Sequence, residues 1–484
     1  MPVLPEIDRL KLFIDGGWAD SLGGDRIEVR NPANQDLVGL ATLASREDAS
    51  RAVAAARRSF DEGAWRRKTA AQRAAVIEKA ADLLEQRLER AALLVTSELG
   101  CTLRVSRAVQ IPTAIRHLRY YAGLIRSFDP DEVRDDGTNR SIVTQEPVGV
   151  VAVITPWNGP VVAPMVHIAP ALAAGCSVVV KPSPETPLSL YEFADGLADA
   201  GLPPGVLNIV PAGRETGEHL VSHPDVEKVA FTGSTAAGKT IMRACADRVA
   251  RVTLELGGKS AAVVLPDADL EAFAGAMLTM ALSLSGQACV AQTRVLAPRS
   301  RHGAVVESLA ETFKQAAVGD PLDPATELGP LVSSAQRDRV ENYIASGRAD
   351  GAQVVVGGDR PHDLNDGWFI NPTLFDRVGN GMRIAREEVF GPVISVIDYQ
   401  GTDEAVSIAN DSPFGLAGSV FGNQEEAMAI ARRIRTGWVS INGHPQAYGS
   451  PLGGFKESGL GRALGPEGLR SYFETKAIAL GPPP

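Results

Sequence analysis

The amino-acid sequence predicts an α/β protein with two parallel-sheet domains and a small β appendage. The first observation is the length of 484 residues, which is enough for two or three domains rather than one. The second is that short apolar runs alternate with helical patterns twice, once after Val148 and again after Ser260. Such alternation is typical of βαβ units, in which helices cover both faces of a parallel sheet. The third is a polar, turn-rich stretch at 127–147 that becomes strand-like and predicts a hairpin.

The expected elements follow in order along the chain. From Glu47 to Cys101, apolar residues recur at three- and four-residue spacing, which predicts helices, and Gly100 is the expected stop. After Val148 the sequence predicts buried strands separated by helices, at "GVVAVI", "SVVVK", "GVLNIV", "VEKVAFT" and "RVTLE". The second series runs from "SAAVVLP" to the helix "NQEEAMAIARRI". The C-terminal "SYFETKAIAL" is a candidate third strand for the hairpin.

Charge and cysteine spacing exclude several classes of function. The formal net charge is −10 and no basic block is present, so we expect no nucleic-acid partner. Cys101, Cys176, Cys245 and Cys289 stand far apart, with no CxxC pair and no His/Cys cluster, which argues against disulfides and a metal site. The N-terminal segment carries charges and prolines where a secretory signal needs an apolar core, and no apolar run reaches about 18 residues. We therefore expect a cytoplasmic protein without a membrane partner.

Residues 233–240, "GSTAAGKT", match the phosphate-loop pattern G-x-x-x-x-G-K-[ST]. A strand, a glycine turn and a helix are predicted here, so backbone N–H groups and a helix end are expected to face an anion. A nucleoside triphosphate and a dinucleotide pyrophosphate both fit that description. A triphosphatase also needs an acid on another strand to hold Mg²⁺, and the nearest candidates, Glu255 and Asp267, are poorly placed. The triphosphatase is therefore disfavoured, but it remains an alternative of another class.

Eight stretches around this loop resemble the aldehyde dehydrogenase superfamily. They are "TPWNGP" (155–160), "KPSPETP" (181–187), "FTGST" (231–235), "LELGGKS" (254–260), "GQACVAQTR" (286–294), "EEVFGPV" (387–393), "NDSPFGLAGSVF" (410–421) and "PLGGFKESGLGR" (451–462). The resemblance covers nearly the whole chain. It implies a Rossmann-like dinucleotide-binding domain at 1–124 and 148–259, a catalytic domain at 260–457, and an oligomerisation segment at 125–147 and 458–484. It also implies that the Gly-Ser-Thr loop binds a pyrophosphate, so that Lys239 occupies the Walker position by coincidence.

The implied reaction is the oxidation of an aldehyde to a carboxylic acid with NAD(P)+. Cys289 matches the family's nucleophile, which attacks the aldehyde carbon to form a thiohemiacetal and then a thioester. Asn158 matches the oxyanion-hole residue, with the backbone N–H of Cys289 as its partner. Glu255 matches the general base that activates water to hydrolyse the thioester. From the residues alone, a role as a turn residue is favoured for Asn158, and a strand-end acid in an ion pair is the alternative for Glu255.

The resemblance further implies which residues hold the cofactor. Lys181 matches the lysine that reaches the adenosine ribose, while Glu388 and Phe390 match residues at the nicotinamide end. The full expected cofactor set is Trp157, Lys181, Ser183, Glu185, Gly233, Ser234, Leu256, Gly257, Glu388 and Phe390. NAD is the expected cofactor and NADP is possible, because Pro184 stands where many NAD-preferring members carry an acid that would repel a 2′-phosphate.

The substrate side departs from the usual pattern. An aromatic residue often follows the oxyanion asparagine in this family, whereas this chain has Gly159, which predicts a roomy pocket for bulky or aromatic aldehydes. His444 and Tyr448 lie on the expected pocket loop. The expected partners are a small-molecule aldehyde and further copies of the chain, in a homodimer or homotetramer.

Two rival functions remain beside the triphosphatase. A CoA-acylating aldehyde dehydrogenase would share the nucleophile, but such enzymes usually lack the general-base glutamate that Glu255 supplies here. A noncatalytic binding protein is the other rival, and the presence of Cys289, Asn158 and Glu255 together argues against it.

Overall fold

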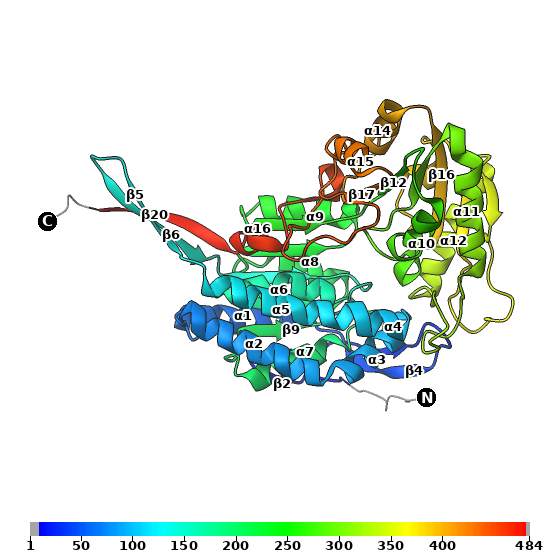
Figure 1. The fold of residues 1–484 in the computed structure, drawn as a ribbon. Helices are drawn as coiled ribbons and strands as arrows, with labels where there is room; N and C mark the ends of the chain where they lie inside the picture. The colour runs from blue at the N-terminus through cyan, green and yellow to red at the C-terminus, as the bar shows by residue number, and fades with distance from the viewer. Residues whose placement is uncertain (1–8, 481–484) are drawn as a thin grey trace.

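The computed structural model describes residues 9–480 and contains two large sheets joined to a protruding arm (Figure 1). The first sheet has a parallel centre with antiparallel strands at both edges. Its strands, in spatial order, are β19 (Gly459–Leu460), β11 (Arg251–Glu255), β10 (Lys228–Thr232), β7 (Val150–Ile154), β8 (Ser177–Lys181), β9 (Leu207–Ile209), β1 (Leu12–Ile14) and β2 (Gly17–Ala19).

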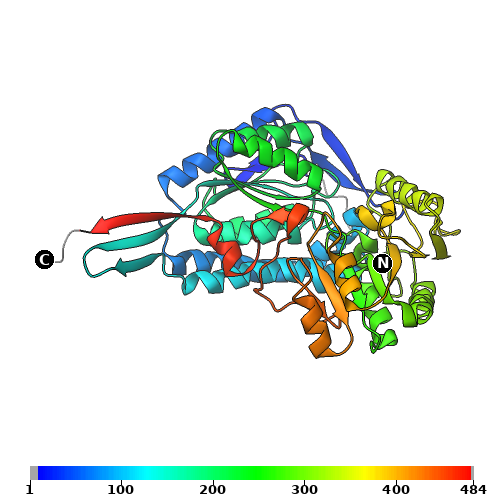
Figure 2. The ribbon, with the colours of Figure 1, turned by 90° about the horizontal axis from the view of Figure 1, so that it is seen from above.

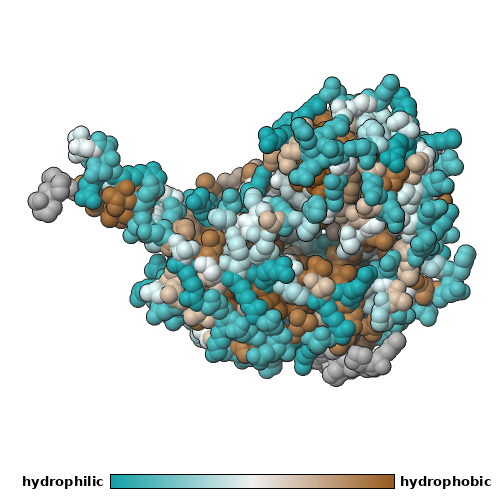
Figure 3. Space-filling view, viewed as in Figure 1, coloured by the Kyte–Doolittle hydropathy of each residue, from teal (hydrophilic) through white to brown (hydrophobic). Residues whose placement is uncertain are grey.

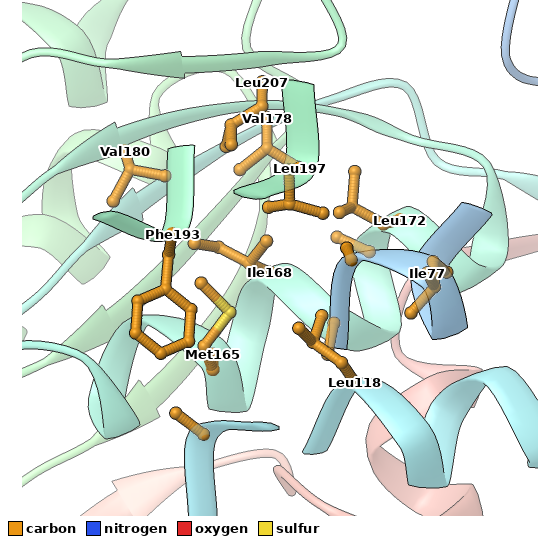
Figure 4. Packing of buried hydrophobic residues seen from close by; sticks show 14 of the residues in the cluster. Ile77, Leu118, Met165, Ile168, Leu172, Val178, Val180, Phe193, Leu197 and Leu207 are labelled. Atoms are coloured by element: carbon orange, nitrogen blue, oxygen red, sulfur yellow. The ribbon is translucent and has the colours of Figure 1, made fainter. Parts of the chain in front are cut away.

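Helices cover both faces of the first sheet. They are α1 (Arg46–Glu62), α2 (Ala70–Gln86), α3 (Leu88–Leu99), α4 (Leu103–Val105), the π-helical turn η1 (Ser106–Gln110), α5 (Ile111–Arg126), α6 (Val162–Ala174), α7 (Leu190–Ala200), α8 (Arg214–Ser222) and α9 (Thr235–Ala246). Side chains alternate along β8, so Val178 and Val180 join the core under α6 while Val179 joins the core on the opposite face. Figure 4 shows the first of these cores, where Met165 and Ile168 of α6 meet Phe193 and Leu197 of α7.

Capping residues explain where the first helices begin and end. Ser45 and Thr69 each form a capping box, which satisfies N–H groups at the starts of α1 and α2. Gly100 adopts left-handed backbone with φ 84° and ends α3, as its position in the sequence predicts.

The second sheet is also parallel except at one edge, where β14 runs antiparallel to β15. Its order is β14 (Gln353–Val356), β15 (Thr373–Asp376), β16 (Val393–Tyr399), β13 (Arg294–Pro298), β12 (Ala261–Val264), β17 (Gly418–Phe421) and β18 (Ser440–Ile441). The helices around it are α10 (Leu270–Met280), α11 (His302–Gln315), α12 (Ser334–Ala349), α13 (Arg383–Arg386), α14 (Thr402–Asn410) and α15 (Gln424–Ala431). This series follows β11 directly in the sequence, so the second sheet begins where the first one receives its last parallel strand.

Three antiparallel strands form the arm, which extends away from both sheets (Figures 1 and 2). They are β5 (Asp131–Asp135), β6 (Arg140–Pro147) and β20 (Phe473–Leu480), which follows the short helix α16 (Gly465–Arg470). β20 pairs with β6 along its whole length, from Phe473 opposite Pro147 to Leu480 opposite Arg140. The hairpin and its C-terminal third strand are therefore present, and the predicted fold class is confirmed.

The sequence patterns missed the N-terminal strands. β1 and β2 are three residues each, and β3 (Arg26–Arg30) and β4 (Leu37–Thr42) form a separate two-stranded sheet. Such short strands give too few alternating positions to show a period. None of the helices in residues 9–480 meets the combination of length and hydropathy expected of a membrane span.

Candidate active site

Loops from both sheets converge on one site. Asn158 follows β7, Gly233 follows β10 and Glu255 ends β11, so all three lie at the carboxyl edge of the first sheet, where parallel sheets bind ligands. Each sheet with its helices is called a unit below. Cys289 comes from the second unit, between the 3₁₀ turn η2 (Ser283–Gly286) and β13. The two sides touch, because the Asn158 Nδ2 atom donates to the Gln287 carbonyl at 2.8 Å.

The loop that carries Cys289 has an unusual backbone. Leu284, Ser285 and Gly286 all adopt left-handed φ angles, of 54°, 54° and 73°. Each non-glycine residue in that region costs on the order of 1–2 kcal/mol, so other contacts must hold the loop. The Ser285 hydroxyl donates to the Gly329 carbonyl at 2.7 Å. A Cβ at Gly286 would overlap the carbonyl oxygen of Gly391, so only glycine fits this position.

Gly329 connects this loop to the first unit. A Cβ on Gly329 would overlap the carbonyl oxygen of Gly100, the residue that ends α3. The Gln287 side chain adds a second tether, since its Oε1 accepts the Val332 N–H at 3.0 Å. The nucleophile loop is therefore fixed by main-chain groups of residues 329–332, and these pack against the end of a first-unit helix.

The Cys289 thiol is protonated in this environment. Burial raises the pKa of the Cys289 thiol to about 12, and the nearby Glu388 and Glu255 carboxylates raise it further. A Cβ at Gly258 would overlap the Cys289 carbonyl oxygen, so the loop after Glu255 reaches the cysteine itself.

Glu255 is a buried carboxylate with 5% of its surface exposed. Neither of its oxygens has a hydrogen-bond partner within residues 9–480. Burial raises its pKa to about 8, and the positive charge of Arg462 opposes the rise. An acid with a pKa close to neutrality and free oxygens is suited to accept a proton from water.

A cavity of about 510 Å³ lies over the carboxyl ends of β7, β8 and β10, on the side of the turn that carries Asn158. Of the expected cofactor residues, it is lined by Trp157, Lys181, Ser183, Gly233 and Ser234. Glu185 lies next to it and accepts a hydrogen bond from the Ser183 hydroxyl.

Leu256, Gly257, Glu388 and Phe390 form a second group on the side of the second unit. A Cβ on Gly257 would lie 2.5 Å from a Glu388 carboxylate oxygen, and Glu388 Oε1 accepts the Gly258 N–H at 3.0 Å. The Phe390 ring meets the Trp157 ring edge-on, with centroids 5.3 Å apart. Leu256 contacts the helix that follows the phosphate-loop pattern, because a Cβ on Gly238 would lie 2.5 Å from its Cδ2.

The phosphate-loop pattern does not form a triphosphate cradle. The Gly233 N–H donates to the Glu255 carbonyl at 3.0 Å, which removes it from any phosphate. Ser234 is the N-cap of α9 and accepts the Ala237 N–H, so the helix begins at Thr235. Lys239 lies in the second turn and forms an ion pair with Glu457 at 2.8 Å.

The expected substrate residues do not gather as one group. The Tyr448 hydroxyl bonds to His117 Nδ1 at 2.6 Å, and its ring packs against Tyr120 of α5. His444 lines a separate cavity of about 350 Å³ together with Trp438.

The extra room predicted at Gly159 is not found beside that residue. A Cβ built on Gly159 would lie 2.9 Å from Val162 Cγ1, so the first turn of α6 already fills the space beside this glycine. The described residues contain no group of three or more His, Cys, Asp or Glu side chains able to hold a metal ion.

Comparison with known proteins identifies the family. The model of the aldehyde dehydrogenase family matches residues 18–478. The chain belongs to the aldehyde dehydrogenase family. It is therefore an oxidoreductase of the aldehyde dehydrogenase type, and the resemblance of the eight stretches is confirmed.

Individual aldehyde dehydrogenases match over their full length. The chain is 46% identical over 476 residues to geranial dehydrogenase from Castellaniella defragrans, covering 98% of this chain and 99% of that protein. It is 43% identical to 3-succinoylsemialdehyde-pyridine dehydrogenase from a Pseudomonas species, covering 97% and 98%. Among solved structures, an aldehyde dehydrogenase of Mycobacterium tuberculosis complexed with NAD+ superposes with a TM-score of 0.97 at 44% identity, covering 99% of both chains. A Pseudomonas syringae aldehyde dehydrogenase mutant complexed with NAD+ and octanal gives 0.94 at 41% identity, covering 97% and 96%.

Sequence reasoning missed the supporting residues of this site. Gln287 stood inside the quoted "GQACVAQTR", but its carbonyl contact with Asn158 depends on the left-handed turn before it. Gln110 was not singled out either, and its Nε2 donates to the Asn158 carbonyl at 3.2 Å. No local pattern marks a residue that acts 48 positions away in the sequence.

Proposed function

We propose that the protein oxidises an aldehyde to the carboxylic acid, with NAD+ as the acceptor. Cys289, Asn158 and Glu255 are the proposed catalytic residues. The observation that carries this proposal is that loops from two sheets meet and contribute a thiol, an amide donor and a carboxylate that has no hydrogen-bond partner in residues 9–480. The turn that carries Asn158 also contributes Trp157 to the lining of the 510 Å³ cavity. The proposal has support from the relatives, since two of the matched solved structures are complexes with NAD+.

The residues of the cavity fit a dinucleotide. Lys181 Nζ donates to the carbonyls of Ala212 and Pro182, at 2.6 and 3.2 Å, which leaves its third N–H for a ribose hydroxyl. The first turn of α9 offers N–H groups and a positive helix end to the pyrophosphate. Glu388 keeps lone pairs for the second ribose beyond the one that accepts Gly258. NAD+, when bound, supplies the hydride acceptor.

The first chemical step is attack by the Cys289 sulfur on the aldehyde carbon. Its thiol must first lose a proton, because the thiolate is the nucleophile and the pKa of the resting thiol is about 12. Glu255 is a buried carboxylate with a pKa of about 8 and is the proposed acceptor of that proton. The attack forms a C–S bond and places negative charge on the former carbonyl oxygen.

Asn158 stabilises that charge. One N–H of its amide is fixed by the Gln287 carbonyl, so the second N–H has a defined direction and is the proposed oxyanion donor, together with the Cys289 N–H. Loss of hydride from the carbon leaves a thioester on Cys289. Glu255 passes the thiol proton to solvent and, ionised again, takes a proton from water, so that the resulting hydroxide attacks the thioester carbon. The C–S bond then breaks, which releases the carboxylic acid and returns the sulfur of Cys289 as a thiolate.

The substrate is proposed to be a bulky or extended aldehyde. The named relatives act on geranial and on a pyridine-bearing semialdehyde, and one solved neighbour holds octanal. Comparing kcat/KM for acetaldehyde, octanal and an aromatic aldehyde tests this proposal. A clear preference for acetaldehyde would contradict it.

An aldehyde panel run with NAD+ and NADP+ tests the function as a whole. We expect NADH formation that depends on both aldehyde and NAD+, with slower turnover on NADP+. Product analysis with and without CoA separates hydrolysis from acyl transfer. Appearance of an acyl-CoA in place of the free acid would contradict the role of Glu255.

We further propose that the protein is a homodimer or homotetramer. The arm projects from the body, and Figure 3 shows hydrophobic surface on it among hydrophilic residues. Its exposed apolar side chains include Val133, Ile478 and Leu480. Such residues are normally covered when they stand on a protruding strand. Light scattering of the full chain is expected to give two or four times the mass of one chain, and a monomer would contradict the proposal.

A further inference from the structure

The π-helical turn η1 is the one described interruption inside the long helix that runs from α4 to α5. Its defining bond runs from the Ile111 N–H to the Ser106 carbonyl, five residues back. Pro112 follows immediately and has no N–H to continue the regular ladder, which accounts for a break at this point. Wide turns of this kind are frequently found at functional sites, so the residues they present merit a search for a partner.

The start of the turn is tied to its surroundings. The Ser106 hydroxyl lies 2.7 Å from the Thr96 hydroxyl of α3 and 3.2 Å from the Cys101 sulfur. Ser106 is fully buried, so this contact holds the wide turn in one position. The last residue of the turn, Gln110, is consequently delivered to a defined place.

Gln110 is buried, with 2% of its surface exposed, and it points at the oxyanion loop. Its Nε2 donates to the Asn158 carbonyl at 3.2 Å. The neighbouring Trp157 carbonyl is held in the same way by the Thr186 hydroxyl, at 2.9 Å. Two side chains from different elements therefore fix consecutive carbonyls of the turn that carries the catalytic amide.

The other end of Asn158 is fixed by the Gln287 carbonyl, which accepts from Nδ2 at 2.8 Å. Asn158 is thus held at its backbone by the first unit and at its side chain by the nucleophile loop of the second. An oxyanion donor is effective when it is aimed before the charge develops, and a displacement of about 1 Å can cost roughly 10²-fold in rate.

We propose that Gln110 is a positioning residue for the oxyanion hole, acting through its hydrogen bond to the Asn158 carbonyl. This inference rests on the proposed oxyanion role of Asn158. Gln110 is not proposed to touch the aldehyde or the cofactor. Its contribution is to hold the backbone of residue 158 so that the free N–H of the amide meets the developing negative charge.

A double-mutant cycle tests the proposal, because a residue that acts only through Asn158 has nothing to act on once that amide is gone. The first variant is Gln110→Met, which keeps the length of the side chain and removes its donor. We expect kcat/KM for the aldehyde to fall about 10-fold, the effect of one lost hydrogen bond at its upper range. The dissociation constant for NAD+ should stay within about 2-fold of the wild type.

Asn158→Ala alone should lower kcat/KM by about 10²–10³-fold. The double variant should lie within about 2-fold of Asn158→Ala. A further 10-fold loss in the double variant would overturn the proposal, since the two residues would then act independently. An unchanged Asn158→Ala would overturn the oxyanion role itself and, with it, this inference.

Thr42→Val is the matched control, because it removes a buried hydroxyl that donates to a main-chain carbonyl, that of Leu10, away from the active site. It should keep kcat/KM within about 2-fold of the wild type. A loss equal to that of Gln110→Met would show that any lost buried hydrogen bond has this effect, and it would overturn the proposal. If Gln110→Met does not fold, Gln110→Asn replaces it, since the shorter amide cannot reach residue 158 and the same coupling is expected.

Discussion

The two sides of the active site are built in different ways. On the first-sheet side, Asn158 and Glu255 stand at the ends of regular buried strands, and no residue of 155–159 or 255–258 has a positive φ. On the second-sheet side, Leu284, Ser285 and Phe390 all have left-handed backbone. The difference teaches that the proposed hydrogen-bond donor and the proposed base lie on regular backbone at or just after strand ends of the first sheet. The nucleophile instead sits on strained backbone that other contacts must restrain.

The largest expected effect is on the second-sheet side. Cys289→Ala removes the proposed nucleophile, so turnover should fall by more than about 10³-fold while NAD+ binding is retained. Steady-state rates and fluorescence titration with NADH measure the two quantities. Cys176→Ala is the control, because Cys176 is buried in the core between α6 and the first sheet and does not line the cavity. Turnover at the wild-type level in Cys289→Ala would remove the basis of the mechanism.

On the first-sheet side, Glu255→Gln should lower kcat by about 10²–10⁴-fold, the usual range for loss of a general base. The wild-type rate should rise as pH increases through about 8, where Glu255 loses its proton, and this limb should disappear in the residual activity of the variant. A pH profile of kcat checks both statements. A limb that persists in Glu255→Gln would assign it to another group.

The raised pKa of Glu255 also predicts how the stability of the protein depends on pH. Burial holds the folded-state pKa of Glu255 near 8, above the ordinary glutamate value of about 4.3. The folded state therefore binds this proton more tightly than the unfolded state does. Its contribution to stability is fully present below about pH 4 and is lost as the pH rises through about 8. Denaturant titrations should show that the free energy of unfolding falls less between pH 6 and pH 9 for Glu255→Gln than for the wild type. Glu98→Gln, at another buried glutamate whose pKa is raised to about 7, should leave the activity limb in place.

A pair of glycine variants compares the two sides directly. Gly286→Ala adds a Cβ that overlaps the main-chain oxygen of Gly391 at a left-handed position, so it should cost about 1–3 kcal/mol and lower kcat about 10-fold or more. Gly159→Ala meets Val162 Cγ1 at 2.9 Å, a side-chain atom that can rotate away, and should cost less. Thermal melts and initial rates measure both. Equal losses of stability and of kcat in the two variants would contradict the proposed difference between strained and regular backbone.

The smallest expected effect tests one restraint on the strained side. Ser285→Ala removes the hydrogen bond to the Gly329 carbonyl and should cost about 1 kcal/mol with a few-fold loss of kcat. Ser308→Ala is a fair comparison, since its hydroxyl also donates to a main-chain carbonyl, that of Leu270, outside the site. A loss of kcat in Ser308→Ala as large as in Ser285→Ala would mean that the contact is only structural.

The comparison also explains what the sequence could and could not predict. Alternating apolar strands predicted the parallel sheets, and position at a strand end placed Asn158 and Glu255 at the same edge. The antiparallel edge strands β1, β2 and β19 escaped notice because two or three residues carry no measurable period. The position of Cys289 followed only from resemblance, because left-handed backbone at Leu284 and Ser285 has no signature in those residue types.

The substrate side shows a different limit. Gly159 suggested space, yet the space beside a glycine depends on its neighbours, and Val162 fills it. Gln110 illustrates the opposite error, since an inconspicuous residue reaches the catalytic loop through a wide helical turn that follows from Pro112 downstream. Both cases depend on distances between segments far apart in the chain, which no local pattern encodes.

Gly100 and Gly329 approach so closely that no side chain fits between the two units at this contact. Because Gly329 also receives the hydroxyl of Ser285, any hinge motion that opened this contact would pull on the anchor of the cysteine. Separation of the two units at this contact would therefore also move the loop that carries Cys289. A bulkier residue at either glycine would push the two segments apart and displace the loop that carries Cys289.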